Sequence, residues 1–123
     1  MSALKFSPAL DREQLRDVTM GDEELMREVL AALWSDTLAQ AAKLGDAVRD
    51  GNAEQCMRLA HYSKGACANV GANAAAEIFR RIETDARSRD FHRCAEGLAA
   101  LSGAMARLEE EVLVLTGAHL SKR

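Results

Sequence analysis

The sequence predicts an all-α protein, an antiparallel up-down four-helix bundle with a short additional N-terminal helix. Of the 123 residues, 48% are hydrophobic but only 4% are aromatic, and proline occurs once. Abundant alanine and leucine favour helices over strands. Apolar residues also recur at three- and four-residue steps over long stretches, as they do on amphipathic helices. Because the length suits one domain and no linker or internal repeat interrupts the chain, we expect residues 1–123 to form a single bundle.

The short N-terminal helix is expected over residues 8–18. Ser7 can cap a helix, and Pro8 suits the first helical position. Leu10 and Leu15 would then cover one end of the bundle.

The first long helix is expected over residues 22–50, where Gly21 ends the preceding segment and Asp22 can act as the N-cap. Its apolar stripe is broad enough to contact neighbours on two sides. The stripe comprises Leu25, Met26, Val29, Leu30, Leu33, Thr37, Leu38, Ala41, Leu44 and Val48. Trp34 is expected at the rim of the core.

A second long helix is expected over residues 52–70. Gly51 suits the left-handed position after a helix, and Asn52 can cap the next one, with Gln55 completing a capping box. Gly71 would end this helix.

The last two helices are expected over residues 73–88 and 90–116, with Asn73 and Asp90 as their caps. The connection before residue 73 is short, so the helices on either side of it must be antiparallel neighbours. The final helix carries a regular apolar seam and should end at Gly117. The seam comprises Leu98, Leu101, Met105, Leu108, Val112 and Leu115.

The most informative stretch, residues 59–72, reads LAHYSKGACANVGA. On a helix its apolar and small residues cluster opposite His61, so the imidazole should point outward. Lys64 and Gly65 follow one turn later on the same face, and Ala68 extends that face with little side chain. Glycine inside a helix costs about 1 kcal/mol relative to alanine, and a closely approaching partner would explain it. The simpler alternative is an ordinary surface histidine beside a tolerated glycine.

Counting through the turn identifies two more candidates. His61 lies ten residues before Gly71, so the residue level with it on the returning helix lies about ten beyond Asn73, which is Glu83. Arg87 follows one turn later. Their flank can turn toward the imidazole, although both could equally be solvated surface charges.

Composition excludes several classes of function. A net charge of −3 with scattered basic residues provides no electrostatic footprint for nucleic acid or an anionic membrane. No apolar run has membrane-spanning length, and the N-terminus lacks a signal-peptide pattern. The three cysteines, Cys56, Cys67 and Cys94, form no C-x-x-C pair, so we expect free, buried thiols and a cytoplasmic protein. No ligand spacing for zinc is present, so no metal site and no cofactor are expected.

The residues His61-Tyr62-Ser63-Lys64-Gly65, followed by Gly71-Ala72, resemble the H-x-x-K-G-x-x-x-x-x-G-A signature of histidine-containing phosphotransfer (HPt) domains, modules of two-component phosphorelays. Gly21-Asp22-Glu23-Glu24-Leu25 is similar to the G-D-x-E-L segment that opens the second helix of that family. Ser63 departs from the leucine common at its position. Because this position faces inward, the departure affects local core packing more than chemistry, and a serine hydroxyl can bond to the carbonyl four residues back.

The resemblance implies a role for each candidate residue. His61 would be phosphorylated on Nε2, and Glu83 would orient the ring by accepting a hydrogen bond from the Nδ1–H group. Lys64, assisted by Arg87, would offset the phosphoryl charge, and Gly65 would clear space for the partner. A neutral imidazole is a competent nucleophile near physiological pH.

The resemblance also implies the partners: a response-regulator receiver domain with a phosphorylatable aspartate, and an upstream hybrid sensor kinase. Mg²⁺ would belong to the receiver. Since the chain has no P-loop and no glycine-rich nucleotide site, we expect a monomeric relay without kinase activity of its own. The alternative is a helical docking module that binds a signalling partner without being phosphorylated.

Overall fold

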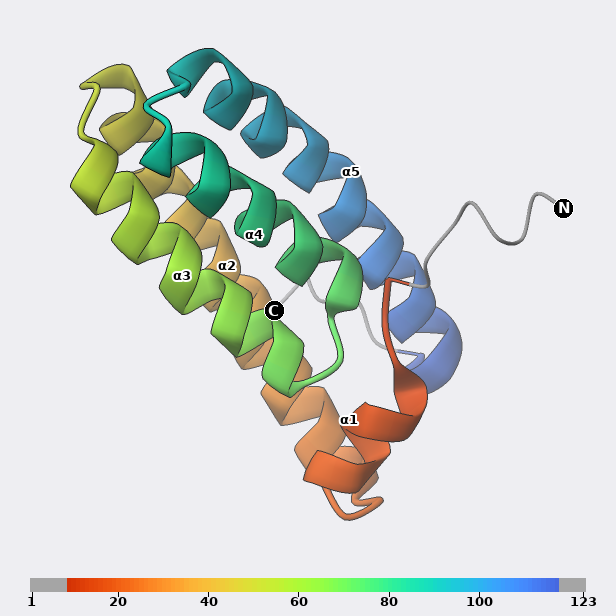
Figure 1. Ribbon diagram of the computed structural model, residues 1–123. Helices are drawn as coiled ribbons and strands as arrows, with labels where there is room; N and C mark the ends of the chain where they lie inside the picture. The colour runs from red at the N-terminus through yellow and green to blue at the C-terminus, as the bar shows by residue number, and fades with distance from the viewer. Residues whose placement is uncertain (1–8, 118–123) are drawn as a thin grey trace, which may run out of the picture.

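The computed structural model describes residues 9–117, and within them every regular element is helical. The helices are α1 (Arg12–Val18), α2 (Glu23–Arg49), α3 (Ala53–Asn69), α4 (Asn73–Arg87) and α5 (Phe91–Thr116). Each of the four long helices packs against two others, because α2 contacts α3 and α5, and α4 contacts α3 and α5. Short turns join them, and α1 lies across one end (Figure 1). The predicted all-α bundle with a short N-terminal helix is therefore confirmed.

Three of the predicted caps are formed. The side chains of Asp22, Asn52 and Asp90 each accept a hydrogen bond of 3.1 Å from a backbone N–H three residues later. Gln55 does not complete a capping box, because its side-chain oxygen accepts a hydrogen bond from Arg58 instead. The backbone N–H of Asn52 donates to the carbonyl of Ala47, at 2.9 Å.

The first helix begins later than predicted, at Arg12 rather than near residue 8. Asp11 is its cap and accepts a hydrogen bond of 3.1 Å from the backbone N–H of Gln14. The helix cannot extend toward residue 8 because the backbone of Asp11 is extended, with φ −87° and ψ 99°. The backbone N–H groups of the two residues before it donate to the carboxylate of Glu111 on α5, at 2.8 and 3.2 Å. The predicted Ser7 and Pro8 start signal lies outside the described residues. Leu10 and Leu15 are buried, as expected.

The prediction that Asn73 caps α4 is wrong. Gly71 adopts φ +85°, and the N–H of Ala72 bonds back to the carbonyl of Cys67, at 2.9 Å. This tight reversal leaves buried Ala72 in the cap position, without a side-chain hydrogen bond, and makes Asn73 the first helical residue.

The core follows the predicted stripes with one exception. Most of the predicted α2 and α5 positions are buried or packed against the core, and Trp34 is partly buried at its edge. Leu38 is the exception, because its side chain is 49% exposed. Ser63 is buried, as predicted, and its hydroxyl makes no hydrogen bond within residues 9–117, so it does not bond to the carbonyl four residues back.

The three cysteines are free and buried, as predicted. Burial raises the pKa of both Cys67 and Cys94 to about 11. These thiols therefore stay protonated at neutral pH and act as small apolar side chains.

Replacing Gly71 with alanine should destabilise the bundle by about 2–3 kcal/mol, since its φ of +85° disfavours any side chain and an added Cβ would lie 2.7 Å from the backbone oxygen of Asp11. Urea denaturation followed by circular dichroism measures the change. Gly45→Ala is the matched control: a Cβ there meets nothing within 4 Å, so helix propensity should add about 0.5–1 kcal/mol. Equal effects of the two variants would contradict this account of the turn.

Candidate functional site

His61 lies on the outer face of α3, the helix that Asn52 caps. Its side chain is 68% exposed. Ala60 beside it and Ser63 two residues later are buried against the other helices, which fixes this face of α3 outward. The imidazole is therefore held in solvent on a rigid helix, as the sequence predicted.

Glu83 reaches toward His61 from α4, at the position that counting through the turn predicted. Its Oε2 lies 3.1 Å from Nδ1 of His61, and its Oε1 accepts a hydrogen bond of 3.1 Å from Nζ of Lys64. A guanidinium nitrogen of Arg87 lies 3.7 Å from the same Oε2. The carboxylate of Glu83 thus contacts His61 and both predicted cations. Glu83 is therefore not simply a solvated surface charge, which was the alternative interpretation.

The carboxylate of Glu83 is more sheltered than its partners. It is 14% exposed, whereas Lys64 is 31% and Arg87 64% exposed. Burial alone would raise the pKa of Glu83, but its hydrogen bond to Lys64, the charge of Lys64 and the contact with His61 together lower that pKa below its ordinary value. Glu83 is therefore ionised at neutral pH and acts as an acceptor toward Nδ1. This contact favours the tautomer in which Nδ1 carries the proton and Nε2 is the free nucleophile.

Gly65 leaves open space one turn after His61. A Cβ built there would meet nothing within 4 Å, whereas one at Gly97, on α5, would lie 2.6 Å from a side-chain carbon of Ile82. Close helix packing therefore explains Gly97 but not Gly65. Ala68 on the same face is exposed, so the backbone of α3 is thinly covered here.

Sequence analysis missed a contact beside the histidine. The hydroxyl of Tyr62 donates a hydrogen bond of 3.0 Å to Oδ2 of Asp36, on α2. Tyr62 is 53% exposed. Tyr62 is the only tyrosine in a chain with few aromatic residues, and it directly follows His61. This position was the feature of the sequence that could have marked it as a candidate site residue.

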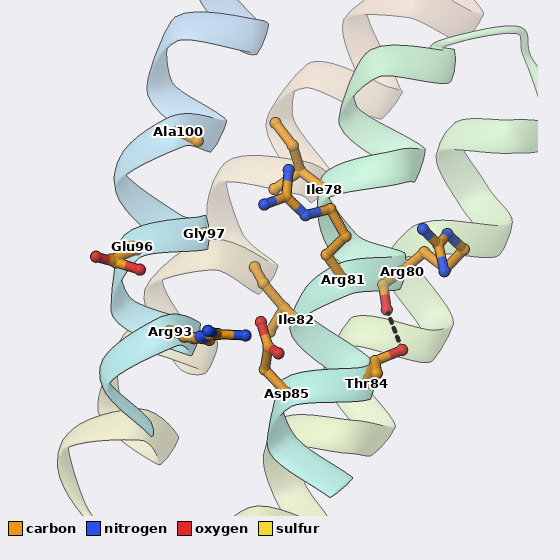
Figure 2. A pocket seen from close by; sticks show the side chains of 10 residues that line it. All are labelled: Ile78, Arg80, Arg81, Ile82, Thr84, Asp85, Arg93, Glu96, Gly97 and Ala100. Carbon is orange, nitrogen blue, oxygen red and sulfur yellow. Dashed lines mark hydrogen bonds between the residues drawn. The ribbon is translucent and has the colours of Figure 1, made fainter. Parts of the chain in front are cut away.

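A hollow of about 540 Å³ lies elsewhere, between α4 and α5, and contains none of the predicted site residues. Figure 2 shows Arg93 pointing from α5 toward Asp85 on α4, and Ile82 and Gly97 also line the hollow. Side chains of opposite charge therefore line this hollow.

The described residues also bear on metals and membranes. Within residues 9–117, no group of three or more histidine, cysteine, aspartate or glutamate side chains is arranged to hold a metal ion. None of the helices there is long and apolar enough to cross a membrane. His92 is exposed on α5, where its Nε2 lies 3.4 Å from Oε2 of Glu96, and it is not part of the His61 site.

Comparison with known proteins gave two matches. The solved structure of histidine-containing phosphotransfer protein B (HptB) from Pseudomonas aeruginosa PAO1 is similar in fold, with a TM-score of 0.75 and 24% sequence identity over 82% of this chain and 88% of that one. A search of curated proteins found no match. The family profile of the Hpt domain matches residues 28–111, a span that contains α3, α4 and all five predicted site residues. The chain therefore belongs to the Hpt domain family, and its function is histidine phosphotransfer in a phosphorelay.

Proposed function

We propose that His61 is the phosphorylated residue and that it carries a phosphoryl group between the aspartates of receiver domains. The observation that carries this assignment is the 3.1 Å contact between Nδ1 of an exposed imidazole and the ionised carboxylate of Glu83. It orients the ring and leaves Nε2 as the atom that reacts.

The transfer step can be written for this geometry. Nε2 attacks the phosphorus of an aspartyl phosphate, the bond from phosphorus to the aspartate oxygen breaks, and the aspartate leaves as a carboxylate. The ring keeps its Nδ1 proton and gains a positive charge, which Glu83 compensates. Transfer to the next receiver reverses these bonds, so the protein returns unchanged.

Lys64 and Arg87 supply the positive charge that the phosphoryl group needs. In the resting protein both engage Glu83, at 3.1 and 3.7 Å. A phosphoryl group on Nε2 brings additional negative charge to the same face and competes for these cations. We assign Lys64 the larger share, because it is the less exposed of the two and its charge is less screened.

The remaining requirements of phosphoryl transfer fall to the partner. Transfer usually needs Mg²⁺ held by carboxylates, but the carboxylate nearest His61 is already engaged by cations. We therefore assign Mg²⁺ and the in-line catalytic groups to the receiver domain, and no cofactor to this chain. The protein is proposed to be a cytoplasmic monomer without kinase activity of its own, supplied by an upstream hybrid sensor kinase.

Replacing His61 with alanine should abolish phosphorylation by a phosphorylated receiver domain. On the wild-type protein, label should be acid-labile and alkali-stable, as expected for phosphohistidine. His92→Ala is the matched control, because His92 is also exposed and lies near a glutamate, yet belongs to α5. Label that persists in His61→Ala, or is lost in His92→Ala, would reassign the acceptor.

Replacing Glu83 with glutamine should slow transfer roughly tenfold, a size typical of losing the group that orients a functional histidine. Glu77→Gln is the control: Glu77 lies on the same helix and pairs with Arg80, outside the His61 cluster, so transfer should not change. Equal rates in both variants would remove Glu83 from the site.

Glu83→Gln should also lower the free energy of unfolding by an amount that depends on pH. The pKa of Glu83 is lower in the folded protein than its ordinary value, so its charge stabilises the fold above about pH 4.5 and this contribution is lost as pH falls through the lowered pKa. The difference in free energy of unfolding between wild type and Glu83→Gln should therefore narrow on acidification from pH 7 to pH 3. A difference that is independent of pH would contradict the linkage.

Replacing Gly65 with glutamine should slow transfer while leaving the fold intact, because the added side chain occupies the partner's space. Helix propensity should raise the free energy of unfolding by about 0.5 kcal/mol. Gly45→Gln is the matched control, since a Cβ at either glycine meets nothing within 4 Å, and it should transfer normally. An unchanged rate in Gly65→Gln would leave this glycine without a functional reason.

A further inference from the structure

The exposed apolar side chains of the described residues are distributed unevenly. The large ones are Val18, Met20, Leu38, Tyr62 and Val114. Tyr62 is distinct among them because it directly follows His61 on α3. Tyrosine joins a large apolar ring to a polar hydroxyl, and it is enriched at protein interfaces.

The tyrosine is also held in place. Its hydroxyl donates to Oδ2 of Asp36 at 3.0 Å, across the boundary between α3 and α2. The two residues are 26 apart in sequence, so only the packing of these helices brings them together. A side chain whose orientation is already fixed loses less freedom when a partner covers it.

The two flanks of His61 therefore differ in chemistry. Successive residues on a helix point about 100° apart, so His61 can meet Glu83 of α4 while Tyr62 leans toward α2. Figure 1 shows α3 with α4 along one side and α2 behind it. The α4 flank is charged, and the α2 flank carries the aromatic ring.

We infer that Tyr62 is the specificity-determining contact for the receiver domain that docks on His61, with Asp36 as the residue that positions it. This inference rests on the proposed function. The phosphorus of the receiver's aspartyl phosphate must come within about 3–3.5 Å of Nε2 for transfer. A protein interface covers about 800 Å² on each partner, so a receiver centred on His61 must also cover its neighbour in the chain.

The chemistry of the partner follows from the ring. Tyr62 offers an apolar face beside a group of charges, and tyrosine is among the residues that dominate binding when they lie near the centre of an interface. The matching receiver presents an apolar side chain or loop beside its phosphorylated aspartate, on the side away from Lys64 and Arg87. Receivers with an acidic residue there should bind weakly, because the carboxylate of Asp36 lies beside the ring.

Binding and transfer can be separated experimentally. The probe is the purified receiver domain that labels wild type fastest, with Kd measured by calorimetry and transfer measured at several receiver concentrations. Tyr62→Ala should raise Kd at least about tenfold. The maximal transfer rate at saturating receiver should stay within about twofold of wild type, because Tyr62 does not touch the reacting atoms.

The hydrogen bond is tested by a double-mutant cycle. Tyr62→Phe and Asp36→Ala should each raise Kd roughly threefold, and the double variant should be no worse than either alone, since each removes the same bond. Leu38→Ala is the control, because Leu38 is about as exposed as Tyr62. Leu38 is two residues from Asp36 in the sequence, so it lies on another side of α2. Its Kd should equal that of wild type.

Each outcome decides the inference. A Kd for Tyr62→Ala within twofold of wild type, or no weaker than for Leu38→Ala, overturns it while leaving phosphorylation of His61 in place. If Tyr62→Phe and Asp36→Ala lower the free energy of unfolding but leave Kd unchanged, the hydrogen bond between Tyr62 and Asp36 serves the fold alone. Failure of every receiver domain to label the wild-type protein counts against the proposed function itself, and this inference falls with it.

Discussion

The tight reversal between α3 and α4 is the constraint on which the site depends. Gly71 supplies a left-handed backbone that other residues resist, and the backbone oxygen of Asp11 packs where its side chain would be. This turn sets the register in which Glu83 lies opposite His61. One additional residue before α4 would rotate its positions by about 100° and carry the carboxylate away from the imidazole.

The carboxylate of Glu83 contacts several side chains at once because it is sheltered from solvent but accessible to partners from two helices. Lys64 and His61 from α3, and Arg87 from its own helix, all lie within 4 Å of it. A largely covered carboxylate is tolerated only when its charge is compensated in this way. The compensation places two cations beside the imidazole, as the proposed phosphorylation of His61 requires.

Rigidity near the site comes from the N-terminal segment as well as from the bundle core. Gln14 donates side-chain hydrogen bonds to the carbonyls of Ala68 and Asn69, at 2.6 and 3.3 Å, and so ties the N-terminal segment to the end of α3. The backbone N–H of Asp11 similarly donates to the carbonyl of Gly71, at 2.7 Å. The helix that carries His61 is therefore held at its C-terminal end by α1, while its outer face stays uncovered.

The sequence by itself determined the helices, three of their caps, the outward face of His61 and the level at which Glu83 meets it. These features depend on local spacing: the 3.6-residue period, the chemistry of a capping side chain and the length of one turn. Only the tertiary structure decided where α1 begins and that Ala72 rather than Asn73 occupies the cap of α4. It also decided that the hydroxyl of Ser63 has no hydrogen-bond partner among residues 9–117. It alone also joined Tyr62 to Asp36, because that contact depends on how α2 and α3 pack, and residue spacing within one helix does not encode the position of its neighbour.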